Sequence, residues 1–248
     1  MSLVDDLKAA VRGSVDVSAE ALEKASRDAS LFKILPQAVV TVADASDVSA
    51  LVKYVSEKKK AGVALSVTAR AAGTDMSGGP LNSGIIADMN GMNRVLEVGD
   101  SFAVVEPGAY FRDFDKKTRE KNLELPSYTA SREWCTVGGM VANDSGGEKN
   151  LKYGKTSRYV EELEVVLSDG SVCTLKKLEG EALSAKLAEQ SLEGDIYRGV
   201  AAILKEHKSV IEAAQPTVTK NSAGYALGDI GDGEKSLNLA RLVSGSQG

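Results

Sequence analysis

The sequence predicts an α+β fold in two lobes, and two patterns support this. A β-branched run at 39–42, a helical pattern at 46–55 and an apolar run at 63–68 form a strand–helix–strand unit. Such a unit is typical of a parallel β-α-β arrangement. Beyond residue 84 the chain turns to short strands joined by Gly-Asp and Asp-Gly pairs, which favour hairpins. We therefore expect a small β-α-β lobe, then a larger lobe with a mixed or antiparallel sheet and helices.

The first elements of the chain can be placed in order. The first thirty-odd residues favour one or two short helices, with a weak apolar stripe. Pro36 starts the next unit. In the helix at 46–55, Asp44 or Ser46 is the expected N-cap, and Gly62 is the expected stop. The strand at 63–68 follows at once.

The elements after residue 84 are shorter. The spacing of Phe111, Phe114 and Thr118 predicts a charged helix with one apolar side. The pair Asp169-Gly170 predicts a type I′ turn between two strands. The expected elements are strands at 85–89, 94–98 and 102–106, a helix at 110–122, hairpin strands at 161–168 and 171–175, and helices at 179–190 and 195–214. These patterns divide the chain into an N-terminal helical segment (1–35), a first lobe (36–93) and a second lobe (94–248).

Composition and charge exclude several classes of function. A net charge of −5 over 248 residues argues against DNA or RNA as a partner. No run approaches the ~18 apolar residues of a membrane helix, and the N-terminus does not resemble a signal peptide. With only Cys135 and Cys173, a disulfide framework is not expected, and the cytoplasm is the default compartment. His207 is the single histidine, so neither a multi-histidine metal site nor histidine-based catalysis is expected.

The glycine-rich stretch Arg70–Pro80 carries the strongest functional signal. It follows a predicted strand, so it lies at the carboxyl edge of the sheet, where unscreened backbone N–H groups bind anions such as nucleotide phosphates. It matches neither common phosphate-loop pattern. We therefore expect a phosphate cradle of another type. Its candidate cofactor-binding residues are Arg70, Ala71, Ala72, Gly73, Thr74, Asp75, Met76 and Ser77.

Two charged side chains of this loop have roles that the sequence leaves open. Arg70 either remains in the cradle as a counter-charge or pairs with a carboxylate. Asp75 would repel a diphosphate, unless its carboxylate faces solvent or caps a neighbouring N–H group, which is the alternative that we favour.

A second glycine-rich segment, Ser131–Gly147, contains two Gly-Gly pairs among small and polar residues. Glycines would let the backbone lie flat against a planar ligand, with N–H and hydroxyl groups at its edge. The alternative is a glycine-rich connection that closes a sheet edge. Within it, Trp134 is expected to anchor packing or to reach the ligand. The candidate ligand-binding residues are Thr136, Val137, Gly138, Gly139, Asn143, Ser145 and Gly146.

Taken together, these segments resemble the FAD-binding domain of the p-cresol methylhydroxylase and vanillyl-alcohol oxidase superfamily. The D-lactate dehydrogenase and glycolate oxidase flavin-subunit group is the most similar branch. The resemblance includes Pro107-Gly108, Tyr153-Gly154 and the run 160–170, and it extends over Lys220–Leu227 to Gly245–Gly248.

The resemblance implies a two-lobed domain of the p-cresol methylhydroxylase type, with FAD extended between the lobes. The loop at 70–77 would wrap the pyrophosphate, and the segment at 136–147 would follow the ribityl chain and the flavin ring. Val160 and Glu161 would lie at the adenine end.

Three departures from the family pattern qualify this expectation. The loop has no histidine, which excludes an 8α-histidyl bond there, and we expect FAD to be held non-covalently. Cys135 sits near the position of a flavin-attacking cysteine in bicovalent members, but a buried apolar role is the simpler reading. The chain ends within a family motif, so we expect the substrate-binding domain to lie beyond it.

The function expected from this resemblance is oxidation of a small organic substrate, a 2-hydroxy acid, by an FAD-dependent enzyme of which this chain is the flavin module. The module alone is expected not to turn over. No catalytic residue, no metal and no electron acceptor can be assigned. The alternatives are a non-catalytic flavin-carrying or electron-transfer subunit, and a nucleotide-binding or structural α+β domain without FAD.

Overall fold

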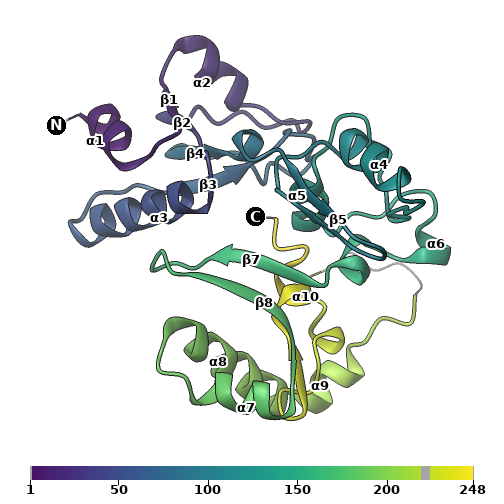
Figure 1. Cartoon of the computed structure of the whole chain (residues 1–248). Helices are drawn as coiled ribbons and strands as arrows, with labels where there is room; N and C mark the ends of the chain where they lie inside the picture. Colours follow the sequence, from purple (N-terminus) through teal and green to yellow (C-terminus); the bar gives the residue numbers. More distant parts are fainter. Residues whose placement is uncertain (1, 219–223, 248) are drawn as a thin grey trace.

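A computed structural model describes residues 2–218 and 224–247 (Figure 1). Residues 220–223 of the stretch Lys220–Leu227, and Gly248, lie outside the described residues. A four-stranded sheet with helix α3 forms one part of the molecule, and a three-stranded sheet with helices α7 and α8 forms another. The last described residues of the chain, which follow the helix labelled α10, lie between these two parts in Figure 1.

The first sheet has the strand order β1-β2-β4-β3, with β1 antiparallel to β2 and the other pairs parallel. Its strands are β1 (Ser14–Asp16), β2 (Ala38–Thr41), β3 (Val67–Arg70) and β4 (Ile85–Asp88). The predicted β-α-β unit is present, because α3 (Ala45–Lys60) joins the parallel strands β2 and β3, with β4 inserted between them. The second strand of the unit begins four residues later than predicted.

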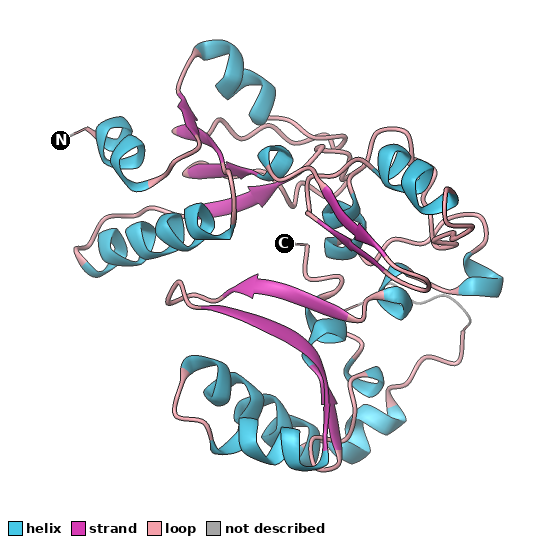
Figure 2. Ribbon diagram, viewed as in Figure 1, coloured by secondary structure: helices cyan, strands magenta, loops and turns pink. Residues whose placement is uncertain are grey.

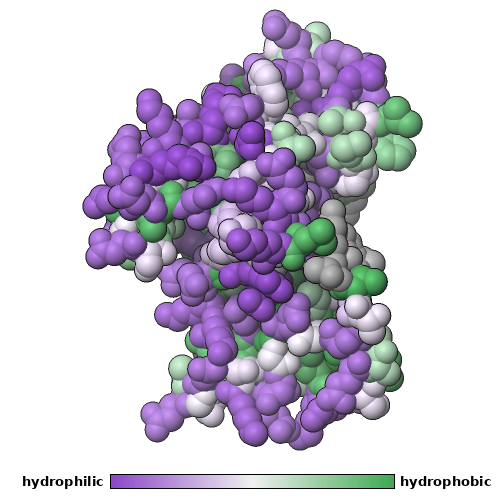
Figure 3. Space-filling view, turned by 90° about the vertical axis from the view of Figure 1, so that its right-hand side faces the viewer, coloured by the Kyte–Doolittle hydropathy of each residue, from purple (hydrophilic) through white to green (hydrophobic). Residues whose placement is uncertain are grey.

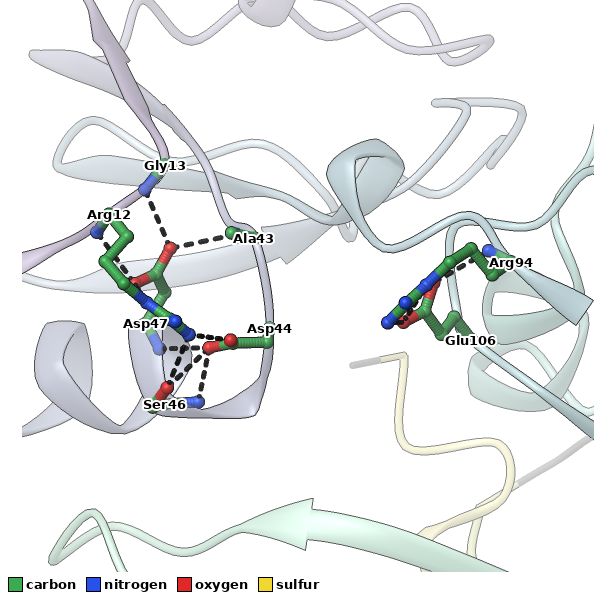
Figure 4. Close-up of polar contacts among 8 residues, drawn as sticks. All are labelled: Arg12, Gly13, Ala43, Asp44, Ser46, Asp47, Arg94 and Glu106. Carbon is green, nitrogen blue, oxygen red and sulfur yellow. Dashed lines mark hydrogen bonds and ion pairs between the residues drawn. The ribbon is translucent and has the colours of Figure 1, made fainter. Parts of the chain in front are cut away.

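The N-terminal segment contains the expected helices, α1 (Leu3–Ala10) and α2 (Ala19–Ala25), and also strand β1, which was not predicted. Three residues are too few to show an alternating pattern. The carboxylate of Asp47 secures this segment, because it accepts hydrogen bonds of 2.9 Å from the backbone N–H groups of Arg12, Gly13 and Ala43 (Figure 4). Asp44 caps α3, one of the two expected alternatives.

A hairpin and a helix come next in the chain. Strands β5 (Val95–Val98) and β6 (Ala103–Val105) pair antiparallel after the short helix η1 (Met89–Gly91), as the Gly-Asp pair predicted. Helix α4 (Phe111–Arg119) buries Phe111, Phe114 and Thr118, the face that their spacing indicated. The two phenylalanines form a separate core with Tyr128, Cys135, Val137 and Met140.

The last sheet has the order β7-β8-β9 and is antiparallel throughout. Its strands are β7 (Glu162–Val166), β8 (Val172–Glu179) and β9 (Ser236–Asn238). Helices α7 (Gly180–Ala188), α8 (Leu192–Glu206) and α10 (Leu239–Val243) contribute to its core, which includes Leu175, Tyr197 and Leu237. Figure 2 shows α7 and α8 lying along the concave side of the bent strand β8.

The predicted type I′ turn between β7 and β8 is wrong. Type I′ needs positive φ at both central residues, but only Gly170, at φ +80°, has it, and Asp169 does not. The N–H of Gly170 donates to the Leu167 carbonyl (2.8 Å), and the N–H of Leu167 donates to the Ser171 carbonyl (2.8 Å). This is a longer hairpin loop, a type I turn followed by a left-handed glycine. The Asp169 side chain accepts the Ser171 N–H, which adds a second local turn.

The expected helix at 195–214 is divided at His207, between α8 and α9 (Lys208–Ala213). The His207 side chain is half exposed, in agreement with a surface role.

None of the helices in the described part of the chain is long and apolar enough to cross a membrane. The face in Figure 3 is largely hydrophilic, with apolar side chains in small groups.

Candidate functional site

The glycine-rich loop leaves the carboxyl end of β3, as predicted. Gly73 adopts φ +69°, and a Cβ there would lie 2.3 Å from a terminal nitrogen of Arg70, so the guanidinium packs against Gly73. Arg70 donates to the Arg27 carbonyl (2.7 Å) and lies 3.5 Å from that of Ala25. Arg70 therefore binds backbone carbonyls, whereas the sequence suggested either a counter-charge in the cradle or a pair with a carboxylate. Burial lowers the pKa of its guanidinium.

The second half of the loop is held by carboxylates. Asp75 Oδ2 accepts hydrogen bonds from the N–H groups of Ser77 (2.9 Å) and Gly79 (3.0 Å). Burial alone would raise the pKa of Asp75, but the hydrogen bonds from Ser77 and Gly79 outweigh this effect and lower it. Asp75 therefore caps N–H groups, the alternative that the sequence favoured. Asp28, which sequence reasoning missed, accepts the N–H of Gly78 (3.0 Å).

The first half of the loop has its donors free. Within residues 2–218 and 224–247, the N–H groups of Ala72, Gly73 and Thr74 make no hydrogen bond. The carbonyl of Ala71 accepts from Asn90 Nδ2 (3.1 Å), which fixes the start of the loop. Free, adjacent donors in a bend with a left-handed glycine fit a phosphate group.

Part of the second glycine-rich segment is helical, rather than the flat backbone that its glycines suggested. Residues Val137–Ala142 form helix α5, with Thr136 as its N-cap accepting from the Gly139 N–H (3.2 Å). Gly138 is required for packing, because a Cβ there would lie 2.5 Å from the Cβ of Pro107. A Cβ on Gly139 would lie 3.9 Å from the Cβ of Ala71, so the helix begins beside the first glycine-rich loop.

The residues that follow α5 turn back into the protein. Asn143 ends the helix and donates to Ser145 Oγ (3.0 Å). The Ser145 carbonyl accepts from the hydroxyl of the buried Thr156 (2.7 Å). Gly146 packs on Asn150, whose Oδ1 would lie 2.7 Å from a Cβ there. This part of the segment is therefore tied to the short helix η2 (Thr156–Tyr159), with Ser145 itself buried.

The last described residues connect the two glycine-rich segments. The N–H of Gln247 donates to the Ala142 carbonyl (2.8 Å), and its side chain donates to Asn143 Oδ1 (3.1 Å). A Cβ on Gly79 would lie 3.5 Å from the Cβ of Gln247. Three stretches far apart in the sequence, around residues 79, 142 and 247, therefore meet at one place.

Val160 and Glu161 lie elsewhere, in a hollow of about 490 Å³ beyond η2. The hollow also presents three basic side chains, Arg158, Lys177 and Arg241, which no motif in the sequence indicated. Lys177 and Arg241 come from β8 and α10, so the tertiary structure alone brings them to this place.

Two neighbouring residues of the second segment, Trp134 and Cys135, differ in burial. Cys135 is buried, and its Sγ lies 3.5 Å from Thr129 Oγ1 within the core of α4. Trp134 is 70% exposed, so the expectation that it anchors packing is wrong. Arg112 donates to the Glu133 carbonyl (2.6 Å), which ties the backbone next to Trp134 to α4.

An ion pair supports the residues after β6 that contact α5. Arg94 binds the buried carboxylate of Glu106 through its backbone N–H (2.7 Å) and its guanidinium (2.6 Å) (Figure 4). The hydrogen bond from the Arg94 side chain lowers the pKa of Glu106, against the opposing effect of burial. Glu106 directly precedes Pro107, so this pair holds the surface on which Gly138 packs. In the described ranges, no group of three or more potential metal ligands occurs.

Comparisons with known proteins agree with this geometry. A family model described as FAD binding domain matches residues 36–176. The D-2-hydroxyglutarate dehydrogenase of Pantoea ananatis is 31% identical over 228 residues, which cover 90% of this chain and 22% of the relative. That of Pseudomonas putida is 28% identical over 240 residues, covering 96% and 24%. The glycolate oxidase subunit GlcD of Bacillus subtilis is 31% identical over 145 residues, covering 57% and 30%. The chain thus spans under a quarter of the length of the two dehydrogenases.

Solved structures show the same fold. The 6-hydroxy-D-nicotine oxidase of Arthrobacter nicotinovorans superposes with a TM-score of 0.58 at 20% identity, covering 67% of this chain and 36% of that chain. An alkyldihydroxyacetonephosphate synthase gives a TM-score of 0.60 at 22% identity, covering 70% and 35%. These matches confirm the two-lobed α+β architecture expected from the sequence.

Proposed function

The chain belongs to the FAD-binding domain family, and on that premise we propose that it is the FAD-holding part of an FAD-dependent oxidoreductase that oxidises a small 2-hydroxy acid. The observation that carries the proposal is the meeting of the phosphate loop, α5 and the residues around Gln247 at one place. The substrate class rests on the relatives, whose names specify 2-hydroxyglutarate and glycolate.

The proposed cofactor site is built around backbone N–H groups of this chain. The free N–H groups of Ala72, Gly73 and Thr74 would bind the pyrophosphate, and Arg70 would support them from behind. The remaining loop residues, Ala71, Asp75, Met76 and Ser77, would shape the cradle. The segment that includes Thr136, Val137, Gly138, Gly139, Asn143, Ser145 and Gly146 would border the ribityl chain and the flavin. Val160 and Glu161, in the basic hollow, would border the adenine.

The proposed division of labour places the cofactor between lobes 36–93 and 94–248, with 1–35 as an N-terminal segment. When bound, FAD would supply the redox chemistry by taking up one hydride equivalent, that is, two electrons and a proton. The residues of this chain bind and orient it. Non-covalent binding is supported by the burial of Cys135 and by a loop without histidine. Two free cysteines support the cytoplasm as the compartment.

The absorption spectrum of the purified full chain tests the proposal, before and after incubation with FAD and removal of excess. We expect a flavin spectrum at one FAD per chain. After acid precipitation the yellow colour should stay in the supernatant, as expected for a non-covalent cofactor. A folded chain that takes up no FAD would refute the proposed function, and colour that stays with the pellet would refute non-covalent attachment.

A further inference from the structure

The backbone N–H groups of the proposed phosphate loop (70–80) include two sets. Those of residues 72–74 make no hydrogen bond within the described residues, and those of residues 77–79 donate to carboxylates. Asp75 Oδ2 accepts the Ser77 N–H and hydroxyl (2.9 and 2.6 Å) and the Gly79 N–H (3.0 Å). Three donors therefore converge on one oxygen, from within the loop itself. A buried or half-buried N–H group without an acceptor would be costly.

The N-terminal segment supplies the second carboxylate. Asp28 Oδ2 accepts the Gly78 N–H (3.0 Å), and the Ala29 N–H donates to the Asp75 carbonyl (2.9 Å). The ring of Phe32 covers Gly78, since a Cβ there would lie 2.9 Å from Cδ2. The stretch following α2 therefore clamps the second half of the loop from outside.

These carboxylates lie in the same short loop as the free donors of Ala72, Gly73 and Thr74. Two negative charges close to a bound diphosphate would weaken its binding, because like charges repel. Their presence is understandable only if the shape that they impose on the loop outweighs this repulsion. Arg70, fixed to the Arg27 carbonyl beneath Gly73, supports the other half in the same way.

We propose that Asp28 and Asp75 are positioning residues that hold the loop in its diphosphate-binding shape, by saturating the N–H groups of 77–79 and so reserving those of 72–74 for the pyrophosphate. This inference rests on the proposed function. The rival reading is that Asp75 competes with the pyrophosphate for the same donors. The two readings predict opposite effects when the carboxylate is removed.

The test measures the dissociation constants of FAD and of riboflavin, which lacks the diphosphate, by flavin fluorescence for the full chain and its variants. Asp75→Ala and Asp28→Ala remove the acceptor. Asp75→Asn keeps one oxygen that can accept from Ser77 and Gly79 but removes the charge. Asp100→Ala, in the exposed turn between β5 and β6, is the matched control for loss of one carboxylate.

We expect Asp75→Ala and Asp28→Ala to weaken FAD binding about tenfold or more, since each leaves loop donors unsatisfied. Asp75→Asn should stay within about threefold of wild type, because the acceptor remains. Riboflavin affinity should change less than about twofold in every variant, because the loop contacts only the diphosphate. Asp100→Ala should bind both ligands as wild type does.

Three results would overturn the inference: tighter or unchanged FAD binding by Asp75→Ala, equal losses for FAD and riboflavin, or a tenfold loss in Asp75→Asn. If Asp75→Ala does not fold, Asp28→Ala, which removes the acceptor of the Gly78 N–H, still tests the inference: unchanged FAD binding there would overturn it. Absence of FAD binding by the wild-type chain would instead refute the proposed function, so the two failures are distinguishable.

Discussion

Replacing Gly73 with valine tests the cradle most directly. The residue has φ +69°, and left-handed backbone costs an L-residue about 1–2 kcal/mol. Its Cβ would also lie 2.3 Å from the Arg70 guanidinium, which would have to leave the Arg27 carbonyl. Loss of a hydrogen bond from a charged donor costs about 1.5–3 kcal/mol. Together these effects disfavour the binding-competent loop by about 2.5–5 kcal/mol, so the FAD dissociation constant should rise about sixtyfold or more.

Gly62→Val is the matched control. Gly62 has φ +82°, lies at the end of α3, and would bring its Cβ within 4 Å of no other atom. It carries the same backbone strain without the collision. We expect it to lower the free energy of unfolding, measured in urea, by about 1–2 kcal/mol and to leave FAD binding unchanged. A folded Gly73→Val chain that retains wild-type flavin affinity would refute the assigned cradle.

Three further predictions concern the cofactor, the activity and the acid stability. Cys135→Ala should retain full flavin content by absorbance, because the thiol faces the core of α4; loss of flavin in a folded variant would contradict this. The FAD-loaded chain should show no dye-linked oxidation of D-2-hydroxy acids, because it spans only 22–24% of its dehydrogenase relatives; robust turnover would mean that catalytic residues lie within it. The hydrogen bond from Arg94 lowers the pKa of Glu106 in the folded chain. The contribution of this pair to stability is therefore fully present above the unfolded-state pKa of about 4.5, and it is lost as the pH falls through the lower folded-state pKa. Glu106→Gln should therefore be less stable than wild type at pH 7, and urea titrations at pH 3 to 7 should show a smaller acid loss. An unchanged pH dependence would contradict this account.

Much of the fold could be predicted from local patterns. The β-α-β unit, the hairpin at Gly99-Asp100 and the buried face of α4 follow from periodicity and turn residues, which act over a few neighbours along the chain. Strand β1 could not be predicted this way, because it is three residues long and exists through pairing with β2. The type of the β7–β8 turn was also not predicted correctly. Leu167 and Ser171 pair across a three-residue loop, and the pair Asp169-Gly170 alone does not indicate that length.

The sequence by itself determined where the proposed phosphate site lies, because a strand end followed by glycines with permissive backbones is a local feature of the chain. The tertiary structure decided which N–H groups of that site stay free. Asp28 lies 50 residues from Gly78, and its hydrogen bond exists only because the N-terminal segment folds against the loop. The same is true of α5, whose glycines suggested a backbone lying flat against a ligand. Gly138 allows the close contact of α5 with Pro107, and such contacts between distant segments leave no periodic signal in the chain.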